Sequence, residues 1–188
     1  MILLLILACA PALTGGTRDR VSLAVPSGWE LTRNHRFLGT DNVAMKHGDA
    51  AISVLVVADN GLAQSYPLDV VASVRALSWG RKLGVQNNVV AEHSVSLDGR
   101  EAYAVTGLRQ WRTTRIGYTM VVTRTCGRLA EVVLHAPPDS LDFHTRDWGT
   151  ILESLHIVES PGWVSVAGPL FVDEGWRHAR DCQQAEAS

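Results

Sequence analysis

The side chains best suited to chemistry in this 188-residue sequence are its seven histidines and three cysteines. The histidines are spread along the chain at His35, His47, His93, His135, His144, His156 and His178. No two of them have the four-residue spacing that places two ligands on one face of a helix, and no tight cluster has the pattern of a zinc motif. From spacing alone we therefore predict no metal site and no cofactor.

A group of polar residues lies at a predicted corner between a strand and a helix. His135, Asp139 and His144 fall where a predicted strand ends and a predicted helix begins, so they could approach one another. We interpret them as solvated residues of a corner, because exposed polar residues are common at such positions. The sequence also lacks a Gly-x-Ser-x-Gly elbow, a P-loop and a dinucleotide-binding glycine pattern. We predict that the protein is not an enzyme.

Cys9 follows an uninterrupted apolar run at residues 2–8. The run is too short to span a bilayer, which needs about 20 apolar residues. Residues 6–9 (ILAC) resemble the lipobox of bacterial lipoproteins, and this resemblance implies that Cys9 becomes the lipidated first residue. The alternatives are a cleaved signal peptide ending near Ala10 or Ala12, and a native first strand or helix. We expect export to the bacterial cell envelope, with the chain tethered to the membrane.

Export changes the interpretation of the remaining cysteines, Cys126 and Cys182. They form an even pair in a compartment that permits disulfides, so a bridge between them is predicted to tie the C-terminal tail to the domain. Two unpaired cysteines are the alternative. Arg124 and Arg128 flank Cys126 and would favour its thiolate, but the sequence assigns it no histidine partner.

A basic and aromatic group marks a predicted hairpin tip. Trp111 is accompanied by Arg109, Arg112 and Arg115. Guanidinium groups beside an aromatic ring suit an acidic protein partner or lipid headgroups. Ordinary cation–π packing on a surface hairpin is the alternative.

The predicted elements that position these residues form an α+β domain. A strand is expected at 21–25, a hairpin at 42–47 and 51–57, and a helix at 67–83 with apolar positions Leu68, Val71, Val74 and Leu77. Four β-rich runs follow, at 88–97, 101–111, 115–125 and 128–136. Their short turns require an antiparallel meander. A last helix runs from Asp139 or Ser140 towards Leu155, and we expect both helices to pack against the sheet.

The composition indicates a globular protein without an excess of positive charge. Hydrophobic residues make up 46% of the chain and charged residues 19%, which is typical of a globular protein. The formal net charge of -2 provides no electrostatic attraction towards nucleic acid. We divide the chain into a leader and linker at 1–20, the domain at 21–158 and a C-terminal tail at 159–188.

Four short motifs lie in order along the domain, at 25–29 (VPSGW), 97–102 (LDGREA), 130–136 (AEVVLHA) and 151–155 (ILESL). Together with the order of the elements, they resemble the PsbP and Mog superfamily. That resemblance implies an antiparallel meander in an α/β/α sandwich. It also implies an accessory or partner-binding role, because relatives include a photosystem subunit, a partner of the GTPase Ran and bacterial lipoproteins. It transfers no binding residue to this chain.

The function predicted from these observations is that of a non-catalytic envelope lipoprotein that binds a protein partner or scaffolds a complex. The alternative is a binder of a small apolar ligand or a glycan, and an enzyme is the least favoured class. A flat apolar surface would favour the first class, a large dry pocket the second, and convergent titratable side chains the third.

Overall fold

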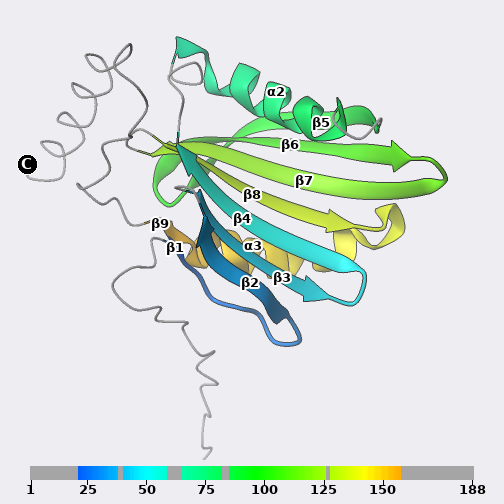
Figure 1. Cartoon of the computed structure of the whole chain (residues 1–188), viewed down its shortest axis with the longest axis horizontal. Helices are drawn as coiled ribbons and strands as arrows, with labels where there is room; N and C mark the ends of the chain where they lie inside the picture. The colour runs from blue at the N-terminus through cyan, green and yellow to red at the C-terminus, as the bar shows by residue number, and fades with distance from the viewer. Residues whose placement is uncertain (1–20, 38–39, 59–64, 82–84, 126–127, 158–188) are drawn as a thin grey trace, which may run out of the picture.

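The computed structural model describes residues 21–37, 40–58, 65–81, 85–125 and 128–157 (Figure 1). Cys9, Cys126 and Cys182 lie outside these residues, as do the predicted leader and tail. The lipidation and the disulfide therefore stay predictions. None of the described helices combines the length and the hydrophobicity of a membrane span.

The domain is built on an antiparallel sheet of seven strands in the order β2-β3-β4-β8-β7-β6-β5. Its strands are β2 (Glu30–Phe37), β3 (Thr40–His47), β4 (Ala50–Ala58), β5 (Gln86–Leu97), β6 (Arg100–Trp111), β7 (Thr114–Thr125) and β8 (Arg128–Ala136). A separate two-stranded sheet pairs β1 (Val21–Ser22) with β9 (His156–Ile157). The predicted fold class is confirmed, because all neighbouring strands are antiparallel and the predicted meander forms β5 to β8.

The two helices of the described residues lie on opposite faces of the large sheet (Figure 1). They are α2 (Leu68–Arg81) and α3 (Thr145–Ser154), and the short 3-10 turns η1 (Pro138–Ser140) and η2 (Asp142–His144) precede α3. The core under α3 includes Trp29, Trp148 and Ile151, and the core under α2 includes Tyr118 and Met120. Because β8 lies between β4 and β7 in the middle of the sheet, it is buried on both faces.

The packing of α2 differs from the prediction at half of its apolar positions. Leu68 and Val71 are buried as expected, whereas Val74 is 56% and Leu77 43% exposed. The buried face is completed by Ala72 and Ala76, each fully buried. An alanine at the contact lets the helix backbone approach the sheet closely, so the small side chains rather than the larger valine and leucine face the core.

Two strands were not predicted. In β2 the sequence is ELTRNHRF, which lacks the alternation of apolar residues that reveals a half-buried strand. The strand lies at the sheet edge, where pairing with β3 alone maintains it. The two-residue strand β9 is held by Asp98, whose Oδ2 accepts a hydrogen bond of 3.0 Å from the Ile157 amide.

Candidate functional site

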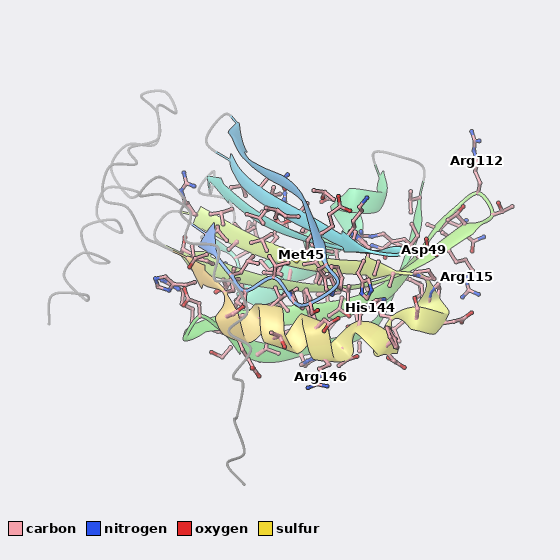
Figure 2. The ribbon with its side chains drawn as sticks, turned by 90° about the horizontal axis from the view of Figure 1, so that it is seen from below. Met45, Asp49, Arg112, Arg115, His144 and Arg146 are labelled. Carbon is pink, nitrogen blue, oxygen red and sulfur yellow. The ribbon has the colours of Figure 1, made fainter. Side chains whose placement is uncertain are left out.

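A pocket of about 380 Å³ lies where the β3–β4 turn meets the connection between β8 and α3. Its lining combines acidic, imidazole and apolar side chains, provided by His47, Gly48, Asp49, Ala50, Pro137, Asp139, Ser140, Phe143 and His144. Phe143 is 77% exposed, which is unusual for a large apolar residue. In Figure 2, Asp49 and His144 lie toward the same end of the molecule as Arg112 and Arg115 of the β6–β7 hairpin.

Three residues that can bind a metal come together beside this pocket. His47 ends β3, His144 ends η2, and Asp147 lies in the first turn of α3. Each offers one ligand atom, and these atoms all lie within 4.8 Å of one another. The site therefore depends on packing between the sheet and α3, and it contains two imidazoles and one carboxylate.

Trp29 orders this cluster. Its Nε1–H donates a hydrogen bond of 2.9 Å to Oδ2 of Asp147. Its ring centroid lies 5.6 Å from that of His47 and 5.6 Å from that of His144, with both contacts edge-on. The turn before β2 places Trp29, because the Trp29 amide donates to the carbonyl of Pro26 at 3.2 Å and Gly28 has φ +86°. A positive φ favours glycine, so the Pro-x-Gly-Trp motif has a structural explanation.

The two histidines of the cluster have unsatisfied nitrogens. Nδ1 of His47 and Nδ1 of His144 are both buried and have no hydrogen-bond partner among the described residues. The whole His144 side chain is only 6% exposed. A buried polar atom without a partner costs about 1–3 kcal/mol, so each of these nitrogens would gain from an additional ligand.

The structure separates the predicted corner group. His144 and Asp139 line the same pocket, but His135 is engaged elsewhere, with its Nε2 2.7 Å from Nη1 of Arg109. Burial, together with the nearby Arg109 charge, lowers the pKa of His135 to about 4. His135 is therefore a neutral partner of Arg109 at physiological pH, and the three predicted residues do not form one cluster.

One residue of the predicted partner patch, Arg109, is buried. Arg109 is only 8% exposed, and its guanidinium carbon lies 4.0 Å from the centre of the Tyr118 ring. Alternation along β6 turns Arg109 towards the α2 side of the sheet, so the surface hairpin cannot present it. Arg112 and Arg115 are exposed at the hairpin tip (Figure 2). The side chain of Trp111 lies outside what the structure describes.

Sequence reasoning did not find His47, Asp147 and Trp29 as members of a site. Trp29 and Asp147 are 118 residues apart, and His47 belongs to β3, which is also far from α3 in the sequence. The Pro-x-Gly-Trp motif was the one sequence signal near this site, and it indicated fold rather than chemistry.

Solved structures share the architecture. The solution structure of the cyanobacterial PsbP from Synechocystis sp. PCC 6803 matches with a TM-score of 0.59 and 18% identity. The match covers 75% of this chain and 88% of that one. The Ran-binding protein Mog1p of Saccharomyces cerevisiae matches with a TM-score of 0.53 and 10% identity, over 74% and 91% of the two chains. No protein-family model and no curated protein sequence significantly matches the chain. The comparisons show a PsbP/Mog-like fold.

Proposed function

We propose that this chain, which has the PsbP/Mog-like fold, is a non-catalytic accessory protein that binds a protein partner through the outer face of α2. Partner binding is the property named for the structurally similar Mog1p, a Ran-binding protein. That likeness supports the class of function, and a surface of the present chain provides the specific evidence.

The observation that carries the proposal is a second apolar face on α2. Tyr66, just before the helix, is 53% exposed, and Val70, Val74 and Leu77 are 41%, 56% and 43% exposed. Their spacing of four, four and three residues places them in one stripe along the helix. An exposed contiguous apolar surface is typical of a protein–protein contact site. An exposed apolar surface supports the first of the functional classes expected from the sequence.

The helix that bears this stripe is firmly attached to the sheet. Arg75 on α2 forms an ion pair with Glu131 of β8, whose side chain is fully buried. Ser73 Oγ donates to Glu92 of β5 at 2.7 Å, and Asn87 Nδ2 donates to the carbonyl of Ala76 at 2.6 Å. Because these contacts hold α2 in place, little conformational entropy is lost when a partner binds.

We further propose that the protein acts in the cell envelope, where a lipid on Cys9 would hold it at the membrane. The support is the lipobox-like stretch at residues 6–9. A partner at the same membrane would then be encountered at raised effective concentration, so an interface as small as one helix face would be sufficient. Arg112 and Arg115 provide a second candidate contact, suited to an acidic partner or lipid headgroups.

Site-specific photo-crosslinking in the native host tests the proposal. A photoreactive amino acid at Val74 should form an adduct of defined mass, and Val70→Glu in the same chain should remove it. The matched control is a probe at Arg146, an exposed residue of α3 on the opposite face of the sheet. The same adduct from both positions, or an adduct insensitive to Val70→Glu, would contradict the assignment of the α2 face.

A further inference from the structure

We propose that His47, His144 and Asp147 form a binding site for a divalent transition-metal ion of the zinc class. This site is separate from the α2 face and goes beyond a role in partner binding. Its three ligand atoms come from β3, η2 and α3 and lie within 4.8 Å of one another.

The donor set selects the class of ion. Two imidazoles and one carboxylate form the combination with which proteins hold Zn²⁺ and its neighbours in open sites of three protein ligands. Ca²⁺ and Mg²⁺ prefer oxygen ligands alone, so two histidines disfavour them. The ion expected here is thus a borderline transition metal.

Burial provides independent support. Nδ1 of His47 and Nδ1 of His144 are removed from solvent without a hydrogen-bond partner among the described residues, and His144 is only 6% exposed. A neutral imidazole nitrogen with a lone pair is a metal ligand as well as a hydrogen-bond acceptor. Coordination through Nδ1 would satisfy, in each ring, a nitrogen that the described side chains leave unsatisfied.

Trp29 contacts the proposed ligands and would support them from outside the coordination sphere. Trp29 donates its Nε1–H to Oδ2 of Asp147 at 2.9 Å, which orients this carboxylate beside the two imidazoles. Hydrogen bonds of this kind orient metal ligands and tune their affinity. Trp29 also makes edge-on contacts with both imidazoles, so one side chain touches all three proposed ligands.

Little movement is needed to close the site. Zinc bonds of about 2.0–2.1 Å place tetrahedral ligand atoms about 3.4 Å apart. The ligand atoms here lie within 4.8 Å of one another, so their separations must contract by up to about 1.4 Å. Side-chain rotation accomplishes a change of this size. His47 and His144 also line the pocket, so the fourth coordination position would be reached from there by water or a ligand. Asp49 and Asp139 in the pocket lining would attract a cation towards it.

Cobalt titration of the full chain is the first test. Co²⁺ should give a saturable d–d absorption band at one ion per chain, and Zn²⁺ should displace it. His47→Gln and Asp147→Asn should each weaken Co²⁺ binding at least tenfold, as expected for loss of a ligand. The matched control is His93→Gln, which changes an exposed histidine of β5 and should leave the affinity unchanged.

A second measurement uses the wild-type chain and does not depend on the folding of any variant. Zn²⁺ should shift the ring-nitrogen resonances of two of the seven histidines in a ¹H–¹⁵N spectrum. Unchanged affinity in both His47→Gln and Asp147→Asn would overturn the proposal. So would absence of saturable binding, or a thiolate-to-cobalt charge-transfer band, which would assign the ion to cysteine.

Discussion

Nη1 of Arg109 lies 2.7 Å from Nε2 of His135, so a buried guanidinium from β6 faces an imidazole from β8 across the intervening strand β7. The arginine donates, which requires Nε2 to be the unprotonated acceptor of the ring. The same guanidinium lies against the Tyr118 ring. A neutral His135 is therefore part of how the sheet accommodates an internal positive charge.

The low pKa of His135 makes the stability of the domain depend on pH. The folded-state pKa is about 4 against an ordinary value of 6.5, so the unfolded chain binds more protons between these values. The stabilisation is fully present above pH 6.5 and is lost as the pH falls towards 4. A shift of this size corresponds to at most about 3 kcal/mol.

Urea unfolding of the wild type and of His135→Gln at pH 7 and pH 4.5 measures this effect. Glutamine keeps an acceptor for Arg109 but does not titrate. We expect the free energy of unfolding to fall less in the variant between the two pH values. Equal losses in the two proteins would show that other groups, such as the carboxylates common to both, account for the pH dependence.

The ion pair between Arg75 and Glu131 should be sensitive to the loss of its cation. Glu131 is fully buried, so Arg75→Met leaves a carboxylate in the core without its partner. Removal of one partner of a buried pair costs about 3–5 kcal/mol. In Arg75→Met/Glu131→Leu the charge is also removed, and we expect most of that loss to be recovered. The free energies of unfolding of the two variants at pH 7 measure the difference, and equal values would contradict this account.

Gly107 should tolerate no side chain. A Cβ at this position would lie 2.5 Å from the carbonyl oxygen of Asn88 and 2.6 Å from the hydroxyl of Tyr118. Overpacking of this kind costs about 1–3 kcal/mol, so Gly107→Ala should lower the unfolding midpoint. Gly149→Ala is the matched control, because nothing lies within 4 Å of its Cβ and alanine favours helix α3 by about 0.5–1 kcal/mol. Opposite shifts are expected, and a shared direction would contradict the prediction.

Lipidation of Cys9 predicts a membrane-bound product of altered mass. Intact mass and membrane partition of natively expressed wild type should show a lipid on a processed N-terminus, and Cys9→Ser should abolish both. A lipid chain adds about 0.8 kcal/mol of membrane affinity per buried methylene, so the partition should change clearly. A soluble wild type with an unmodified cysteine would remove the support for a tethered envelope protein.

Prediction from sequence succeeded where the determining interactions are short-range. Asp98 and Gly99 both have positive φ, as the tight turn between β5 and β6 requires, and such dipeptides reveal hairpins directly. Leu68 and Val71 follow the helical period and are buried. The prediction was wrong for Val74 and Leu77, because periodicity identifies apolar positions on a helix but not which of two apolar faces meets the sheet.

By itself, the sequence determined the α+β class, the antiparallel meander and the resemblance to the PsbP and Mog superfamily, because alternation, turn residues and short motifs are local properties. Only the tertiary structure decided that Arg109 is buried against Tyr118 and His135, and that His47, His144 and Asp147 meet beside one pocket. Those relationships depend on strand order and on the packing of α3 against the sheet. Side chains separated by many residues become neighbours through that packing, and no spacing along the chain encodes it.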